Sequence, residues 1–254
     1  MSLHVETEGA GAPVLFLHGV SGAGATYRWL ALEGCRTVRL TFRGHGASAR
    51  RPGTYRLADY VEDAVSVLEQ IGPAAIVGHS LGGVTAWTVA QQRPELVTRL
   101  FLEDPPLYMG DPRYHGANPA LEGFREQQAA VRAWQARGAT EAEIAAELDF
   151  TDIQTPDAIA SRAYALRHLD PEVLDRVLDG SALTGADATA PVAAPTLIVA
   201  ADEAEGSAFW SEHEQQLAQT HPTVQVVRIP GAPHTIHDTA AVRDEYVRHL
   251  RAWV

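Results

Sequence analysis

The sequence is poor in cysteine and has no long apolar run, and each absence excludes a class of protein. Cys35 is the only cysteine among the 254 residues, so no intramolecular disulfide can form, which suits a reducing compartment. No run of about 18 apolar residues occurs, so we expect no transmembrane helix and no membrane partner. The first residues lack a basic region followed by an apolar core and do not indicate a signal peptide. Together these absences predict a cytoplasmic protein.

The sequence also lacks an excess of cations. It has 20 basic and 32 acidic side chains, which gives a formal net charge of −12. Such a chain has no sequence-wide attraction for phosphate backbones, so we expect no nucleic-acid partner. The length fits one α/β domain with a large buried core, and we expect a monomer or a homodimer.

Short apolar runs alternate with helical patterns through most of the chain. The runs are β-branched and bounded by Gly or Pro, which favours strands over helices. Helical patterns cover residues 57–72, the segment after Ser80 and the last residues. This alternation predicts a mainly parallel sheet with helices on both faces. The predicted strands are residues 13–18, 37–42, 74–79, 100–104, 196–201 and 224–230, with a possible edge strand at 3–8.

The alternation stops between about residues 107 and 187, where helical signals replace strands. Thr140 and Glu143 form a predicted capping box, and Thr155 and Asp170 each precede a proline that can begin a helix. We therefore predict a helical cap at residues 107–187, inserted into a core of residues 1–106 and 188–254. Several aromatic side chains are candidates either for lining an apolar pocket or for ordinary packing: Tyr108, Tyr114, Phe124, Trp134, Phe150, Tyr164 and, outside the cap, Trp210.

The motif "GHSLG" at residues 78–82 fits G-x-S-x-G, the nucleophile elbow. A serine hydroxyl needs a base, a group that orients the base, and donors for the oxyanion. Ser80 follows a predicted strand and precedes a predicted helix, as the elbow requires, and the helix N-terminus adds partial positive charge. Ser80 is therefore the predicted nucleophile, and a simple small-residue turn is the alternative.

The base is expected near the C-terminal end, on the loop after the last predicted strand. His234 lies there, three residues after Gly231, and is the predicted general base. His237 follows closely, and we expect it to cap the final helix, line the site or make a structural polar contact. The expected oxyanion donors are the N–H groups of Leu81, directly after the serine, and of Val20, after a strand that ends in His-Gly.

Five motifs occur in one order along the chain: "FLHG" at residues 16–19, "FRGHGAS" at 42–48, "GHSLGG" at 78–83, "TLIVAAD" at 196–202 and "PGAPHTIH" at 230–237. With them the sequence resembles the α/β-hydrolase fold family over nearly its whole length. The resemblance implies a mostly parallel eight-stranded sheet and a helical cap inserted after the sixth strand. It also implies a triad of Ser, Asp or Glu, and His, with no metal and no organic cofactor.

The triad acid departs from the pattern found in most of that family. There the acid follows the seventh strand in a run close to G-x-x-D. Aligning Ala201 with the glycine places Ala204 at the acid position, and an alanine cannot orient a histidine. Asp202 and Glu205 lie nearby, but each needs a shifted register.

Other branches, including many haloalkane dehalogenases and the zearalenone-type lactonases, carry the acid at the end of the sixth strand. Asp104 stands at the corresponding place, 24 residues after Ser80. Glu103 should point to the opposite side of the strand, because side chains alternate. Asp104 is therefore the predicted acid, ahead of Asp202, Glu205 and Glu103.

The identity of the nucleophile narrows the chemistry. Epoxide hydrolases and haloalkane dehalogenases use an aspartate at the elbow, so Ser80 argues against both. A serine indicates acyl transfer, and we predict hydrolysis of a carboxylic ester or lactone of a small apolar substrate. The alternatives are carbon–carbon bond hydrolysis of a diketone-type substrate, a cofactor-free perhydrolase, and a non-catalytic ligand receptor on the same fold.

Overall fold

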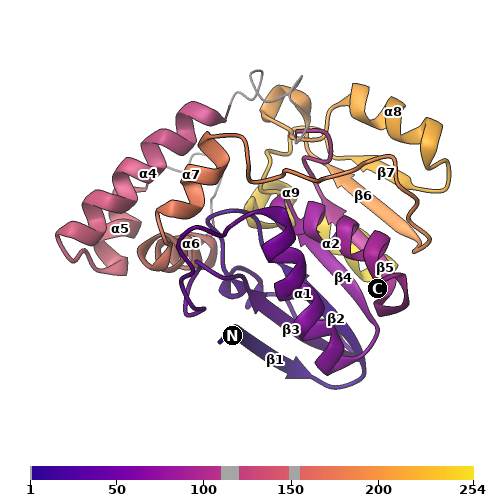
Figure 1. The fold of residues 1–254 in the computed structure, drawn as a ribbon, viewed down its shortest axis with the longest axis horizontal. Coiled ribbons are helices and arrows are strands. Elements are labelled where there is room, and N and C mark those ends of the chain that lie inside the picture. Colours follow the sequence, from indigo (N-terminus) through magenta and orange to yellow (C-terminus); the bar gives the residue numbers. More distant parts are fainter. Residues whose placement is uncertain (1, 110–119, 149–154) are drawn as a thin grey trace.

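A computed structural model describes residues 2–109, 120–148 and 155–254 of the chain. Within these residues one sheet of seven strands organises the molecule, in the order β1-β3-β2-β4-β5-β6-β7 (Figure 1). β1 pairs antiparallel with β3, and all other neighbours are parallel. The strands are β1 (His4–Gly9), β2 (Ala12–Leu17), β3 (Cys35–Thr41), β4 (Ala74–His79), β5 (Val97–Glu103), β6 (Thr196–Ala200) and β7 (Gln225–Arg228).

The predicted fold class is confirmed, and each predicted strand forms, including the edge strand. The expected number of eight strands is wrong for the described residues, which form seven. Among the described residues β1 forms one edge of the sheet, with β3 as its single neighbour. The strand that carries Asp104 at its end is therefore β5 here, and the strand after the helical insertion is β6.

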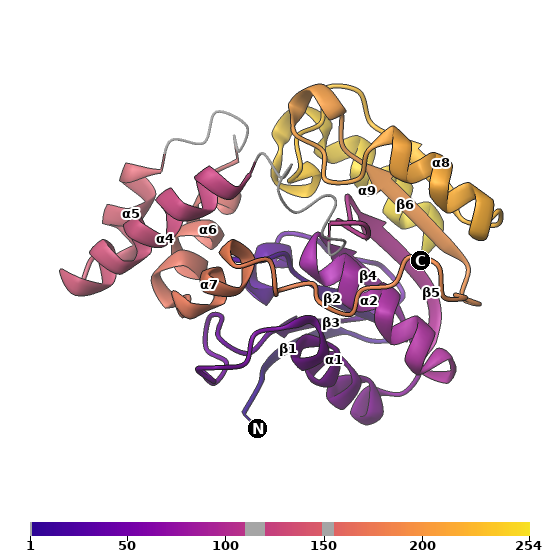
Figure 2. The ribbon, with the colours of Figure 1, turned by 45° about the horizontal axis from the view of Figure 1, so that its top comes forward.

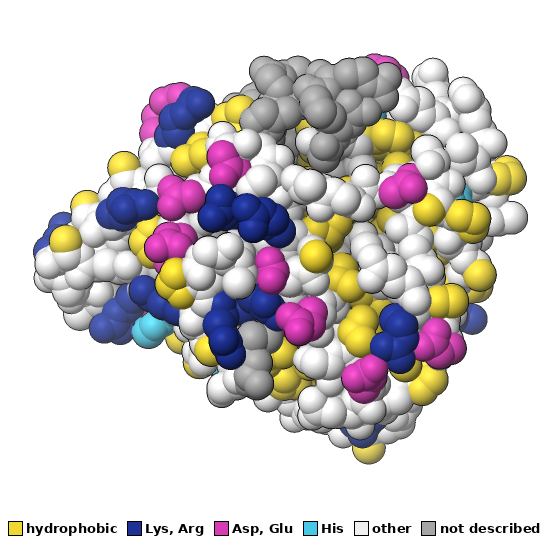
Figure 3. Space-filling model, viewed as in Figure 1, with side chains coloured by type: hydrophobic (Ala, Val, Ile, Leu, Met, Phe, Trp, Pro, Cys, Tyr) yellow, Lys and Arg dark blue, Asp and Glu magenta, His cyan; other side chains and the backbone are white. Residues whose placement is uncertain are grey.

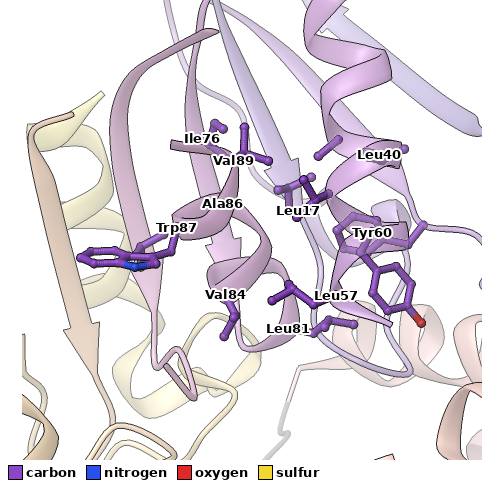
Figure 4. Packing of buried hydrophobic residues seen from close by; sticks show 14 of the residues in the cluster. Leu17, Leu40, Leu57, Tyr60, Ile76, Leu81, Val84, Ala86, Trp87 and Val89 are labelled. Carbon is purple, nitrogen blue, oxygen red and sulfur yellow. The ribbon is translucent and has the colours of Figure 1, made fainter. Parts of the chain in front are cut away.

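Helices cover both faces of the sheet, because alternate residues of the central strands point to opposite sides. On one face, Leu15 of β2 and Ile76 of β4 pack with α1 (Leu57–Ile71) and α2 (Leu81–Gln92). Figure 4 shows Leu81, Val84 and Val89 of α2 in this cluster beside Leu17 and Tyr60. On the other face, Phe16 and Val77 pack with Tyr246 and Leu250 of α9 (Ala240–Trp253). β4 is buried along its whole length, as a central parallel strand requires.

Four helices of the described residues lie between β5 and β6 and gather on one side of the molecule (Figures 1 and 2). The predicted capping box is confirmed, because Thr140 and Glu143 bond each other's backbone N–H groups at the start of α5. The helix predicted after Asp170 begins one residue later than expected, after Pro171, and Asp170 accepts from the N–H of Glu172 at 3.1 Å and from the hydroxyl of Tyr55. The helices are α4 (Leu121–Ala136), α5 (Glu141–Glu147), α6 (Pro156–His168) and α7 (Glu172–Leu178).

The surface mixes charges of both signs. Arg132 lies beside Asp175, and Arg125 beside Glu122, on the side formed by the inserted helices. Figure 3 shows this mixture of Arg with Asp and Glu on the same face as Figure 1. No helix among the described residues is both long enough and apolar enough to cross a membrane.

Candidate active site

Ser80 lies at the turn between β4 and α2 and is almost fully buried. Its backbone has a φ of 51°, in the left-handed region that non-glycine residues rarely occupy. The N–H of Ser80 donates to the carbonyl of Glu103 at 3.0 Å, which ties the turn to the end of β5. A strained backbone of this kind costs about 1–3 kcal/mol and persists only where the surroundings hold it.

The glycines that flank Ser80 are required by close packing. A Cβ atom on Gly78 would lie 2.5 Å from the carbonyl oxygen of Gly82. A Cβ atom on Gly82 would lie 2.1 Å from the carbonyl oxygen of Leu17 in β2. Neither glycine has a left-handed φ, so the G-x-S-x-G pattern reflects how closely α2 approaches the two strands.

His234 lies on the loop after β7 and meets the carboxylate of Asp104. The Nδ1–H of His234 donates to Oδ2 of Asp104 at 2.6 Å. Asp104 is fully buried directly after β5, whereas 33% of the His234 side chain is exposed. His234 and Ser80 line the same pocket, so the two predicted reactive side chains face one cavity.

The carboxylate of Asp104 receives hydrogen bonds from the loop that follows β6. Ser207 donates its hydroxyl at 2.6 Å, and the backbone N–H groups of Ala208 and Ala201 donate at 2.7 and 3.1 Å. Burial raises the pKa of Asp104, but the hydrogen bonds from His234, Ala208 and Ser207 outweigh burial and hold this pKa below its usual value. Asp104 is therefore ionised and can orient the His234 ring.

Replacing Ser207 by alanine is expected to destabilise the folded protein at neutral pH, and to do so less as the pH falls. The pKa of Asp104 is depressed in the folded protein, so its hydrogen bonds stabilise the fold above the ordinary pKa of an aspartate, and this stability is lost as the pH falls through the lower pKa of the folded state. Losing the Ser207 hydroxyl raises the pKa of Asp104 in the folded protein and removes part of that stability. A hydrogen bond to a charged group contributes about 1.5–3 kcal/mol, and a loss of this size is expected in the free energy of unfolding at pH 7, measured by urea denaturation.

The matched control is Ser211→Ala, because the Ser211 hydroxyl donates to Glu203 and does not contact Asp104. This variant should lose much less stability at pH 7, because Glu203 is exposed. Equal free energies of unfolding for Ser207→Ala and the wild type at pH 7 would contradict the assigned role of the Ser207 hydroxyl.

The other carboxylates considered for the triad point elsewhere. Asp202 accepts from the N–H groups of Gly231 at 2.8 Å and Ala204 at 3.0 Å, where it caps a short 3₁₀ helix. Glu205 is exposed on that same short helix. Glu103 is buried and bonds His237, on the opposite side of the strand from Asp104. Of these four carboxylates, the structure places only Asp104 against His234.

The loop that carries Val20 is held by a buried histidine of defined tautomer. The N–H of Phe42 donates to Nε2 of His18 at 3.0 Å, so the ring proton sits on Nδ1 and donates to the carbonyl of Gly19 at 2.8 Å. Burial lowers the pKa of His18 well below its usual value, which keeps this ring neutral. A Cβ atom on Gly19 would lie 3.3 Å from the Cβ of Ser80, so the loop runs directly against the serine. Val20 and Leu81 both line the pocket.

The pocket has a volume of about 180 Å³ and a mainly apolar lining. The inserted helices contribute Phe124, Val173 and Val177, and the loop after β6 contributes Ser207 and Ala208. Sequence reasoning missed Ser207 and Ala208, and no local pattern marks them. The remaining lining residues are Val20, Tyr55, Tyr60, Ser80, Leu81, Pro106, Met109, Ala120, Ala182, Leu183, Gly206 and His234.

Some of the candidate aromatic side chains line the pocket, and others pack against neighbouring side chains elsewhere. Phe124 lines the pocket, whereas Trp134 is buried in the core and donates to Glu147. Tyr108 and Trp210 stack on His213. Tyr164 packs beside a small group of buried alanines. Tyr114 and Phe150 lie outside the described residues.

A mostly parallel sheet whose central strand leads through a strained, buried serine into a helix defines an α/β hydrolase. A histidine after β7 and an ionised carboxylate after β5 complete that arrangement. The chain belongs to the alpha/beta hydrolase family, whose model matches residues 14–247. It is therefore an enzyme of the hydrolase class.

Known relatives and solved structures share this fold. The sn-1-specific diacylglycerol lipase ABHD11 of Mus musculus is 27% identical over 236 residues, which cover 88% of this chain and 75% of the lipase. A 2-(acetamidomethylene)succinate hydrolase of Mesorhizobium japonicum is 32% identical over 102 residues, 38% of this chain and 37% of that protein. The structure of a marine microorganism esterase has a TM-score of 0.80 at 20% identity and covers 99% of both chains.

Proposed function

We propose that this protein is a serine hydrolase that cleaves a carboxylic ester or lactone of a small apolar substrate through an acyl-enzyme. The observation that carries the proposal is the 2.6 Å hydrogen bond from His234 to buried Asp104, with His234 and Ser80 lining one apolar pocket. Ser80 is the nucleophile in this proposal, His234 the base and Asp104 the acid.

The proton positions follow from the hydrogen bonds. Because Nδ1 of His234 donates to Asp104, Nε2 is left without a proton and can accept the proton of the Ser80 hydroxyl. Ser80 Oγ bonds to the acyl carbon, and His234 returns the proton to the leaving alcohol. Water then attacks the acyl-enzyme with His234 again as base, and the Val20 and Leu81 N–H groups stabilise the oxyanion.

The pocket favours an uncharged, compact substrate. Among its described lining residues there is no arginine, aspartate or glutamate, so a charged acyl group would lose its hydration without gaining a partner. Phe124, Val173 and Val177 supply apolar contacts from the inserted helices, and we propose that residues 107–187 act as a cap over the site. The lipase and esterase named above support ester cleavage.

Hydrolysis of a panel of p-nitrophenyl esters and lactones tests the proposal. Uncharged esters with short to medium acyl chains should be cleaved with burst kinetics, and a succinate half-ester of similar length should be cleaved at least about tenfold more slowly, a difference of about 1.4 kcal/mol in the transition state. Equal preference for the charged ester would contradict the substrate class. Turnover of ring-fission dienoic acids without ester cleavage would instead favour carbon–carbon bond hydrolysis.

A further inference from the structure

A second buried carboxylate–histidine pair lies beside the first. The N–H of His237 donates to Oε1 of Glu103 at 3.0 Å. The ring Nδ1 of His237 lies 2.8 and 2.7 Å from the two carboxylate oxygens. Glu103 directly precedes Asp104, and His237 follows His234 by three residues. Two carboxylate–histidine pairs therefore join the end of β5 to the same loop.

The second pair is an ion pair. Burial raises the pKa of Glu103, but the charge and the hydrogen bonds of His237 bring this pKa below its usual value. Burial lowers the pKa of His237, and the charges of Glu103 and Asp238 more than reverse this. The other charged or titratable groups around the pair are Arg243, which bonds the His237 carbonyl at 2.8 Å, and Tyr27 and Tyr246, whose rings pack on His237.

His79 joins this pair to the candidate catalytic histidine. Its Nε2–H donates to the carbonyl of His234 at 3.0 Å. Its ring centre lies 4.8 Å from that of His234 and 4.9 Å from that of His237. Burial lowers the pKa of His79 well below its usual value, so the ring is neutral. Its single N–H group is the donor in the bond to the His234 carbonyl. His79 also directly precedes Ser80.

The side chains of His79, Glu103 and His237 also have the chemistry of a metal site, with ligand atoms within 4.8 Å of one another. Each of them already has a protein partner. Glu103 binds two N–H groups of His237, and His79 binds the His234 carbonyl. The arrangement therefore favours a positioning role over an ion.

We propose that Glu103 and His237, with His79 between them and the active site, are positioning residues that fix His234 relative to Ser80. The inference rests on the proposed function, because it assumes that His234 acts on Ser80. Asp104 fixes the direction of the Nδ1–H bond but does not hold the backbone that follows His234. The Glu103–His237 pair and the His79 bond hold that backbone, because they bind the N–H of His237 and the carbonyl of His234. A base misplaced by about 1 Å can lose about a hundredfold in rate.

Glu103→Gln tests the proposal, because glutamine keeps the shape but cannot accept two N–H bonds with a full charge. We expect kcat for the best p-nitrophenyl ester to fall about tenfold or more, with KM unchanged within about twofold. The control is Asp63→Asn, which weakens another buried ion pair. Asp63 accepts hydrogen bonds from the Arg43 guanidinium at 2.6 and 2.9 Å, and neither residue lines the pocket. Asp63→Asn should lower the melting temperature but leave kcat of the folded enzyme unchanged.

A second readout does not depend on turnover. The short His234–Asp104 bond should give a downfield imidazole N–H resonance in the proton NMR spectrum, absent in Asp104→Asn. This resonance should shift or broaden in Glu103→Gln and stay in place in Asp63→Asn. His237→Gln, which retains the backbone N–H bond to Glu103, should behave like Glu103→Gln and replaces it if that variant does not fold.

The proposal is overturned if Glu103→Gln and His237→Gln lower only the melting temperature and keep the wild-type kcat and resonance. An absence of Ser80-dependent ester cleavage in the wild-type protein would overturn the proposed function instead. In that case an altered resonance in Glu103→Gln would still show that the Glu103–His237 pair affects the Asp104–His234 pair.

Discussion

Ser80→Ala is expected to lower kcat for ester hydrolysis by about 10⁴–10⁶-fold, with the pre-steady-state burst abolished. Among the described side chains of the pocket, Ser80 alone carries a hydroxyl at the start of α2, where the helix terminus and the Leu81 N–H group can stabilise an oxyanion. The measurement is the rate of p-nitrophenol release from wild-type and variant protein under identical conditions.

The loss in Ser80→Ala should not reflect unfolding. Serine and alanine both carry a Cβ and meet the same strain at a φ of 51°, so the free energy of unfolding should stay within about 0.5 kcal/mol. Ser80→Gly relieves that strain and should be more stable than wild type by about 1 kcal/mol, while it is equally inactive. Equal hydrolysis rates for wild type and Ser80→Ala would exclude the serine mechanism.

Asp104→Asn is expected to lower kcat by about 10³–10⁴-fold. With its oxygen in place of Oδ1, the asparagine side chain can still accept from the Ser207 hydroxyl and the Ala201 N–H, but its NH2 group then replaces Oδ2 and faces Nδ1 of His234. An amide donor at that position requires Nδ1 of His234 to accept, so the ring proton moves to Nε2. Nε2 can then no longer accept the proton of the Ser80 hydroxyl. Asp104→Ala should be at least as inactive and less stable, because it leaves the buried donors without an acceptor.

Asp202→Asn is the matched control for Asp104→Asn. Asp202 binds backbone N–H groups at an exposed turn, and its replacement by asparagine should change kcat by less than about threefold and lower the melting temperature only slightly. The reverse result, with Asp202→Asn inactive and Asp104→Asn active, would show that the loop after β6 supplies the acid.

The strands were predictable because burial on both faces forces short, continuous apolar runs, as in β4 and β6. Helix α8 (Ser211–Thr220) was not predicted, because His213 and Leu217 are its only buried residues and its apolar period is correspondingly weak. The insertion was recognisable as helical from its caps, but no local signal indicates which of its side chains reach the pocket.

The choice of acid shows where local sequence stops being informative. Asp104 ends one predicted strand and Asp202 follows another, and neither segment reveals which carboxylate turns toward His234. That choice depends on contacts between distant parts of the chain: Ser207 lies 103 residues after Asp104, and His234 lies 130 residues after it. The spacing from Ser80 predicted Asp104 only by resemblance, and its hydrogen bonds became visible only in three dimensions.

The hydrogen bonds from the loop after β6 have a consequence for changing substrate selectivity. Ala208 donates its backbone N–H to Asp104, and the same residue lines the pocket. Every amino acid except proline keeps that N–H group. Directed evolution could therefore enlarge the side chain at position 208 to shorten the acyl chain that fits, and the carboxylate behind His234 would keep its backbone donor. At position 208 the two roles therefore belong to different atoms. The backbone N–H binds the carboxylate of Asp104, and the side chain limits which substrate fits the pocket.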